Sequence, residues 1–180
     1  MKFILIRHGK TQGNLERRYI GCRTDEDLCA EGIAQLQTQH YPAADMVFAS
    51  PMKRCIQTAG IIYPGKPICI VNGFQECDFG DFEGHNYDEL RDNPTYQAWL
   101  DSGGELPFPG GESRMEFSER CVKAFQSTAA ALSAGNYAFI IHGGTIMAIM
   151  EHFTGGSYYD FQIQNGKGFI LNADGSYEVL

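Results

Sequence analysis

The chain has 180 residues, of which 43% are hydrophobic, and it carries a formal net charge of -8. This length and apolar content predict a single domain over residues 1-180 that buries its core without a disulfide or a metal. The acidic balance argues against nucleic acid and anionic membranes as partners, and no apolar run is long enough to span a bilayer.

The six cysteines form no C-x-x-C pair, and no signal peptide precedes the first expected strand. We therefore expect reduced thiols and a cytoplasmic location. The nearest cysteine pairs, Cys22/Cys29 and Cys69/Cys77, are too widely spaced for a structural zinc site. No metal and no cofactor are expected.

The first part of the chain alternates between strand and helix patterns. Apolar runs predict strands over 2-7, 46-49 and 68-71. Helical spacing begins at Ala30 and ends near Tyr41-Pro42. A second helix is predicted over 52-62, with Ser50 as its N-cap and Pro51 as its first residue.

The region 72-111 shows no sustained period and is rich in glycine and proline, with short helices expected near 87-91 and 95-100. We interpret it as an inserted region that covers a site and sets substrate specificity. The remaining expected elements are a helix over 112-132, a strand over 137-141, a helix over 144-153, and a hairpin of 168-172 and 176-180.

Alternating strands and helices predict an α/β fold: a three-layer sandwich with a mainly parallel sheet, helices on both faces and the C-terminal hairpin at one edge. In such sheets, ligands bind beyond the carboxyl ends of the strands. Arg7-His8-Gly9 follows the first strand, and His142-Gly143-Gly144 follows the strand over 137-141. If these strands are parallel neighbours, the two histidines meet across one crevice.

A phosphate group suits this arrangement, because an arginine offers a fork of donors that matches its oxygens. Arg54, one turn inside the helix over 52-62, reaches back toward the same crevice. With the phosphate held by Arg7, Arg54 and His142, the neutral imidazole of His8 is free to attack phosphorus and form a phosphohistidine. Glu76, in the acidic loop beyond the third strand, is the expected proton donor.

Each residue also has a simpler interpretation. A single buried histidine is commonly a packed core residue, and Arg54 alone is typical of a solvated helical arginine. The loop 76-84 is equally typical of a solvated acidic surface, and it lacks the ligand spacing of a calcium loop. Gly9-Lys10-Thr11 copies the end of a nucleotide phosphate loop, but Ile4 stands where that loop needs its first glycine.

Taken in order, the motifs resemble those of the histidine phosphatase superfamily, the phosphoglycerate-mutase-like proteins, over nearly the whole chain. The matching segments are R-H-G-x-[ST]-x-x-N at 7-14, S-P-x-x-R-x-x-Q-T-A at 50-59, E-x-x-x-G-x-x-E-G at 76-84, P-G-G-E-S at 109-113, and His142-Gly143. A single motif of this kind is weak evidence for the family, whereas the whole set in this order is specific to it.

The resemblance implies that His8 is the phosphorylated nucleophile and that Glu76 donates the proton and later acts as base. It also implies a phosphate site formed by Arg7, Asn14, Gly21, Arg54, His142 and Gly143, with no metal in the core chemistry. The implied partner is a small phosphorylated metabolite, bound by a monomer or a homodimer.

Departures from the family pattern bear on the substrate. Phe79 and Tyr87 stand where the mutases carry a tyrosine and a lysine, and 88-105 holds no pair of arginines for a substrate carboxylate. The layout is more similar to the α-ribazole phosphatases and fructose-2,6-bisphosphatase-like enzymes. We therefore expect a phosphomonoesterase of broad or α-ribazole type; the alternatives are mutase-type phosphoryl transfer and a catalytically silent phosphate-binding regulatory module.

Two further features of the sequence each have two interpretations. Lys10 replaces the acidic or amide residue common in the family and either attracts phosphorylated substrates or simply faces solvent. The aromatic residues of the inserted region either wall a pocket for a ring-bearing substrate or pack the lid; they are Phe79, Phe82, Tyr87, Tyr96 and Trp99.

Overall fold

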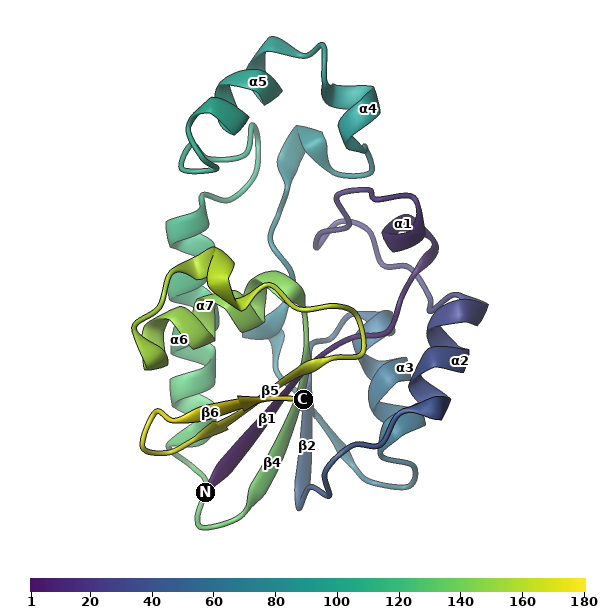
Figure 1. The fold of residues 1–180 in the computed structure, drawn as a ribbon, viewed down its shortest axis with the longest axis vertical. Coiled ribbons are helices and arrows are strands. Elements are labelled where there is room, and N and C mark those ends of the chain that lie inside the picture. The colour runs from purple at the N-terminus through teal and green to yellow at the C-terminus, as the bar shows by residue number, and fades with distance from the viewer.

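The structure, a computed structural model, describes residues 1-180 and is built on one six-stranded sheet with the order β3-β2-β4-β1-β5-β6. The strands β1 to β4 run parallel, and β5 and β6 run antiparallel as the C-terminal hairpin (Figure 1). The strand bounds are β1 Lys2–Arg7, β2 Met46–Ala49, β3 Ile68–Ile70, β4 Asn136–Ile141, β5 Gly168–Asn172 and β6 Tyr177–Val179. The predicted α/β fold with its edge hairpin is confirmed.

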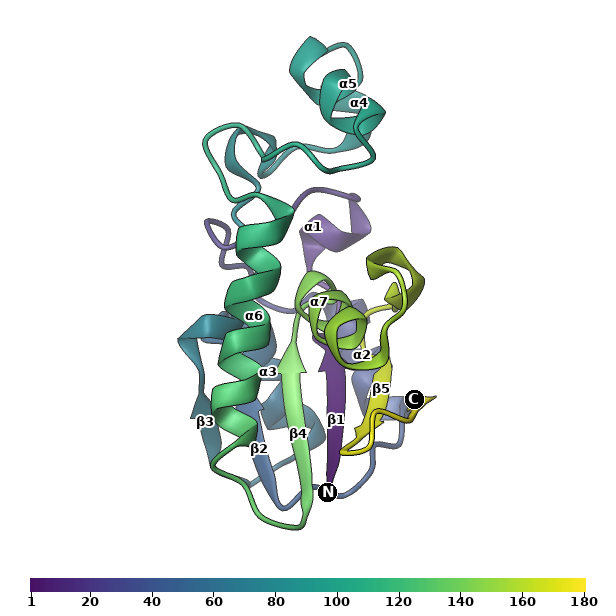
Figure 2. The same ribbon diagram turned by 90° about the vertical axis from the view of Figure 1, so that its left-hand side faces the viewer.

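Helices cover both faces of the sheet, as Figure 2 shows from the side. The helix bounds are α1 Gln12–Leu15, α2 Ala30–Thr38, α3 Lys53–Ile62, α4 Tyr87–Leu90, α5 Pro94–Asp101, α6 Arg114–Ala129 and α7 Gly143–Thr154. Short 3-10 helices lie at Asn72–Phe74, Gly80–Phe82 and Tyr158–Phe161. None of the helices is long and apolar enough to cross a membrane.

Successive side chains of β1 point to opposite faces of the sheet and pack in two separate cores. Phe3 and Leu5 pack with residues of α6 and α7, whereas Ile4 and Ile6 pack with residues of α3 on the opposite face. Because both faces are buried, the central strands are continuously apolar. The strands therefore deliver their last residues to one edge of a rigid sheet.

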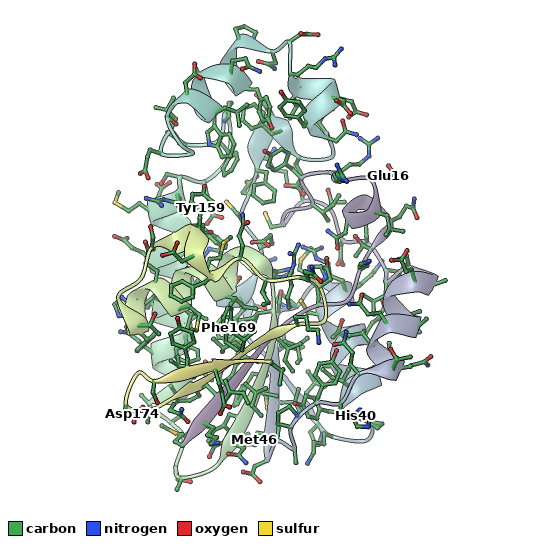
Figure 3. The ribbon with its side chains drawn as sticks, in the orientation of Figure 1. Glu16, His40, Met46, Tyr159, Phe169 and Asp174 are labelled. Atoms are coloured by element: carbon green, nitrogen blue, oxygen red, sulfur yellow. The ribbon has the colours of Figure 1, made fainter.

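The segment 72-111 lies beyond the carboxyl ends of the parallel strands, where α4 and α5 form the upper part of the molecule (Figure 1). It has its own core, in which Phe82, Leu90 and Tyr96 pack with Phe117 of α6. Figure 3 places Tyr159 on the side that faces this segment, and Met46, at the start of β2, at the opposite end.

Two helix starts differ from the sequence expectation. The helix α3 begins at Lys53, with Met52 as its N-cap; the Ser50 hydroxyl accepts from the Met52 N–H at 3.4 Å and also contacts His142 Nε2. The helix α6 begins at Arg114 rather than at 112, because Ser113 and Glu116 form a capping box. The α1 helix has no counterpart among the expected elements, since its four residues are too few to show a period.

Candidate active site

The first two site residues are His8 and His142, which leave neighbouring strands side by side. The parallel register of β1 and β4 places Arg7 opposite Ile141. The next residue on each strand is a histidine, and the two rings meet edge to face with centroids 5.2 Å apart. The structure thus brings together the two histidines that the sequence placed at one crevice.

His8 is held in one orientation and is 3% exposed. Its Nδ1 lies 2.7 Å from the Gly9 carbonyl oxygen, and because a carbonyl only accepts, Nδ1 carries the proton. The Nε2 atom then keeps its lone pair. Burial lowers the pKa of His8 well below its usual value, and the nearby charges of Arg54 and Arg7 lower it further.

Arg54 and Arg7 each keep a buried donor without a partner. Arg54 is fully buried and donates to the carbonyls of Thr24 at 2.8 Å and Gly21 at 3.1 Å. Arg7 donates to the carbonyl of Ile163 at 2.7 Å. The Nε atoms of both arginines are buried and have no hydrogen-bond partner. Buried unpaired N–H groups are rare in proteins, so these donors suit an anion.

His142, the N-cap residue of α7, is fixed by one side chain from the β2–α3 connection and one from α3. Its Nε2 lies 2.8 Å from Ser50 Oγ and 3.6 Å from Cys55 Sγ. Burial lowers the pKa of His142 well below its usual value, and the charge of Arg54 adds to that effect. The site therefore presents two neutral imidazoles beside two arginines.

Glu76 supplies the only carboxyl group among the residues assigned to the site. It is 7% exposed, and burial raises its pKa, although the N–H groups of Cys77 and Gly144 and the charges of Arg54 and Arg7 oppose the shift. Its Oε1 accepts from the Cys77 N–H at 3.0 Å. Because a protonated carboxyl group accepts mainly through its carbonyl oxygen, this contact favours the proton on Oε2.

The other candidate residues of the phosphate site are Gly21, Gly143 and Asn14, and they lie in different parts of the fold. The Gly21 carbonyl holds Arg54, and a Cβ at position 21 would lie 2.3 Å from the Cys77 carbonyl oxygen, so this position requires glycine. A Cβ at Gly143, the first residue of α7, would lie 3.3 Å from Arg7 Cζ. Asn14 lies in α1, with its Oδ1 accepting from the Thr11 N–H at 3.2 Å.

A cavity of about 800 Å³ opens beside these groups, and its lining includes Arg7, Glu76, Gly143 and Gly144. His8, Arg54 and His142 do not line it and are buried; Asn14 and Gly21 do not line it either. The volume exceeds what a phosphate ion fills, so the cavity has room for a leaving group.

The far wall of the cavity is aromatic. Of the aromatic residues that the sequence singled out, Phe79 and Trp99 line it, and they are joined by Tyr19 and Phe108. The other three do not line it: Phe82 and Tyr96 are packed in the core of the inserted region, and Tyr87 is 56% exposed.

The cations near the cavity mouth are already paired. Lys10 lines the cavity and lies 2.5 Å from Glu31 Oε1. Arg114 lines it as well and lies 2.5 Å from Glu105 Oε1. Each of these cations thus has a partly exposed acidic partner.

Sequence reasoning missed several residues that shape the site. Thr58 Oγ1 accepts from the Gly9 N–H at 2.9 Å and donates to the Arg54 carbonyl at 2.6 Å, so it joins the turn after β1 to α3. Ser50, expected only as a helix cap, contacts His142. Asn165 contacts the backbone of His8, and no local pattern marks it. Ser50 and Thr58 both belong to the motif over 50-59, which was the one sequence signal for these contacts.

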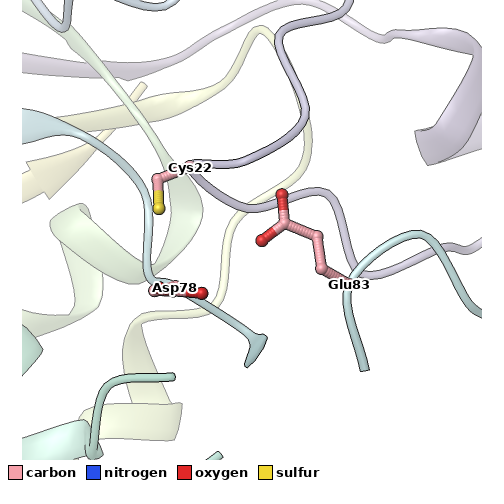
Figure 4. A group of neighbouring side chains, drawn as sticks. All are labelled: Cys22, Asp78 and Glu83. Atoms are coloured by element: carbon pink, nitrogen blue, oxygen red, sulfur yellow. The ribbon is translucent and has the colours of Figure 1, made fainter. Parts of the chain in front are cut away.

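Away from this cluster, Cys22, Asp78 and Glu83 place ligand-type atoms within 4.8 Å of one another (Figure 4). Asp78 is already bound by Arg23 Nε at 2.7 Å and by the Gly80 N–H at 3.0 Å. Burial raises the pKa of the Cys22 thiol to about 11. The phosphate chemistry described below uses none of these three side chains.

The fold and the site agree with one protein family. Residues 3–179 match the model of the histidine phosphatase superfamily, branch 1, and the chain belongs to this family.

Relatives of two kinds are similar to the chain. It is 27% identical to the adenosylcobalamin/alpha-ribazole phosphatase of Escherichia coli (strain K12) over 191 aligned positions, which cover 100% of this chain and 94% of that protein. It is 28% identical to the 2,3-bisphosphoglycerate-dependent phosphoglycerate mutase of Methylobacterium radiotolerans, with 95% of this chain and 90% of that protein covered.

Solved structures show the same fold. The alpha-ribazole phosphatase from Shigella flexneri has a TM-score of 0.83 at 24% identity and covers 100% of this chain and 95% of its own. The phosphoglycerate mutase from Thermus thermophilus has a TM-score of 0.77 at 28% identity, with 100% and 96% covered. Both branches of relatives therefore share the architecture.

Proposed function

We propose that the protein is a phosphomonoester hydrolase that acts through a phosphohistidine on His8. The observation that carries this proposal is the His8 imidazole. Its Nδ1 is engaged by the Gly9 carbonyl, while Nε2 remains unprotonated beside two arginines whose Nε donors are buried and unpaired. A neutral nitrogen nucleophile next to an anion site supports covalent transfer of a phosphoryl group.

In the first step, His8 Nε2 attacks phosphorus while the bond from phosphorus to the leaving oxygen breaks. Arg7, Arg54 and His142 stabilise the charge on the transferring phosphoryl oxygens. The Glu76 carboxyl group gives its Oε2 proton to the departing alkoxide. The raised pKa of Glu76 suits this role, because it keeps the carboxyl group protonated to a higher pH.

In the second step, water attacks the phosphohistidine. The Glu76 carboxylate takes the proton from this water, and the nitrogen–phosphorus bond breaks to release inorganic phosphate. The lone pair returns to His8 Nε2, and Glu76 is again protonated for the next turnover.

The leaving group of the proposed substrate carries a ring and no second anionic group. The aromatic wall of Tyr19, Phe79, Trp99 and Phe108 offers stacking surface, while Lys10 and Arg114 are neutralised by acidic partners. An α-ribazole 5'-phosphate fits this description, and the phosphatase relatives favour it. The segment 72-111 then acts as the lid that selects the substrate.

Phosphoryl transfer of the mutase type is the alternative, because mutases are among the similar proteins. It requires a bisphosphorylated primer and releases little free phosphate. A catalytically silent phosphate-binding module is the other alternative, and it requires no turnover at His8.

The test is to incubate the protein with ³²P-labelled phosphomonoesters and quench it without acid. We expect acid-labile label on His8, steady release of inorganic phosphate, and loss of both in His8→Ala. A panel containing α-ribazole 5'-phosphate, 3-phosphoglycerate with its bisphosphorylated primer, and p-nitrophenyl phosphate separates the alternatives. Isomer formation without phosphate release would establish the mutase, and the absence of label and turnover would leave only the binding module.

A further inference from the structure

We propose that Asn165 is a positioning residue that orients the Asn14 amide toward the phosphate and holds the backbone of the nucleophile. This inference rests on the proposed function, because it assigns a role within the same phosphate site. Asn165 lies in the connection between the Tyr158–Phe161 turn and β5, far from both partners in sequence.

Asn165 joins two parts of the site with one amide nitrogen. Its side chain lines the cavity, and the residue is 8% exposed. Its Nδ2 donates to the His8 carbonyl at 3.1 Å and to Asn14 Oδ1 at 3.2 Å. An amide nitrogen has two protons, so these contacts use both.

The contact with Asn14 decides which end of that amide is free. Asn14 Oδ1 accepts from Asn165 Nδ2 and from the Thr11 N–H, which together occupy its two lone pairs. Asn14 Nδ2 has no partner within the protein. The donor end of Asn14 is therefore the end left for a ligand oxygen, and Asn165 prevents the amide from turning over.

The contact with His8 acts on the nucleophile through its backbone. The Gly166 N–H donates to the Arg7 carbonyl at 2.9 Å and to the His8 carbonyl at 3.2 Å, and Asn165 Nδ2 gives the His8 carbonyl a second donor. The His8 imidazole is in turn fixed to the Gly9 carbonyl. The Asn165 segment thus holds the turn on which the imidazole depends.

The backbone of this segment does not depend on the Asn165 side chain. The Asn165 carbonyl accepts from Gln35 Nε2 at 2.9 Å, and Tyr41 donates its hydroxyl to the Gly166 carbonyl at 2.9 Å. Truncation of the side chain therefore removes the two amide contacts and keeps these anchors.

The experiment compares Asn165→Ala, Asn14→Ala and the double variant. We expect Asn165→Ala to raise the KM for p-nitrophenyl phosphate and the inhibition constant of inorganic phosphate by about tenfold, with a smaller fall in kcat, because a hydrogen bond to a charged ligand is lost. In the Asn14→Ala background, Asn165→Ala should raise these constants by less than about twofold, because the shared donor is already absent.

Two further variants complete the design. Asn165→Asp keeps the shape but replaces the donor with an acceptor, and we expect weaker phosphate binding than in Asn165→Ala because of the added negative charge. Asn172→Ala is the matched control: this asparagine donates to Ser176 Oγ in the hairpin, and its loss should leave KM and the inhibition constant unchanged.

The inference would be overturned if Asn165→Ala left KM and the inhibition constant of phosphate unchanged. It would also be overturned if Asn165→Ala raised these constants by the same factor with and without Asn14→Ala. Calorimetric titration with inorganic phosphate gives the same comparison without turnover, so a protein that binds phosphate but hydrolyses nothing refutes the proposed function alone. If Asn165→Ala does not fold, the isosteric Asn165→Asp takes its place in the test. Wild-type affinity of Asn165→Asp for inorganic phosphate then refutes the inference.

Discussion

The imidazole rings of His8 and His142 meet edge to face with their centroids 5.2 Å apart, and both are buried beside the same arginines. Burial and the positive charge of Arg54 lower the pKa of each ring well below its usual value. Two adjacent imidazoles therefore stay neutral in the folded protein. This pair has consequences for stability as well as for chemistry.

The pH dependence of stability follows from the lowered pKa values of His8 and His142. In the unfolded chain both rings take up protons below about pH 6.5, whereas in the folded protein they resist protonation. The free energy of unfolding should therefore decrease as pH falls below about 6.5, by up to about 2.7 kcal/mol per pH unit. The raised pKa of Glu76 acts in the opposite sense, because its stabilisation is present at low pH and is lost as pH rises.

Urea unfolding between pH 5 and pH 8 measures this dependence. His8→Gln should flatten the slope, whereas His40→Gln should leave it unchanged, since His40 is exposed at the opposite end of the molecule (Figure 3). A wild-type slope that His8→Gln does not alter would contradict the buried neutral imidazole.

The pH dependence of catalysis tests Glu76. Because its pKa is raised, the carboxyl group should donate its proton efficiently at acidic pH, and kcat/KM should fall as pH rises through that pKa. Glu76→Gln should lower kcat by about 10²- to 10⁴-fold and abolish this alkaline limb. The control is Asp81→Asn, which removes an exposed charge from the same loop. If kcat/KM of Glu76→Gln still falls as pH rises, another group donates the proton to the leaving oxygen.

Gly144 tests the geometry around the carboxyl group. A Cβ at this position would lie 2.8 Å from Glu76 Oε1 and 2.9 Å from Phe117 Cε1, so Gly144→Ala must displace one of them. We expect kcat to fall by at least about tenfold and the free energy of unfolding to fall by about 1 to 3 kcal/mol. Gly60→Ala is the control in α3, where a Cβ meets open space, and it should stabilise the helix by about 0.4 to 1 kcal/mol. Normal turnover by Gly144→Ala would show that the Glu76 position is not critical.

Trp99 tests the role of the aromatic wall. Trp99 lines the cavity and its ring lies 5.0 Å from that of Phe108. Trp99→Leu should lower kcat/KM for α-ribazole 5'-phosphate by about tenfold relative to glycerol phosphate, because only the ring-bearing leaving group loses stacking. Tyr87→Leu, at an exposed position outside the cavity, should leave the ratio unchanged. Equal losses for both substrates in Trp99→Leu would show that the wall only packs the lid.

Much of the fold could be predicted because its signals are local. The apolar runs at 2-7 and 137-141 each carry enough period to identify a strand, and the glycines and imidazoles follow directly in the chain. The alternation of elements predicted a mainly parallel sheet, whereas the structure shows that β1 and β4 are the neighbours that this sheet required at the crevice. The helix starts were less predictable: Ser50 was expected as the N-cap of α3, whereas Met52 takes that position and the Ser50 hydroxyl also contacts His142.

The cavity wall was only partly predictable, because an aromatic residue in an irregular segment has no period that shows its direction. Phe79 and Phe82 are three positions apart in one loop, yet Phe79 faces the cavity and Phe82 is packed in the core. Tyr19 reaches the same wall from the N-terminal part of the chain. Such contacts depend on how loops pack.

The sequence by itself predicts the proposed class of chemistry, because His8, Arg54, Glu76 and His142 each stand beside a strand end or helix start that local patterns identify. How these groups are held depends on the folded arrangement: which nitrogen of His8 is free, which oxygen of Glu76 carries a proton, and which end of Asn14 faces a ligand. Those choices follow from hydrogen bonds between residues far apart in the chain, such as Asn165 to His8, and no local pattern encodes their geometry.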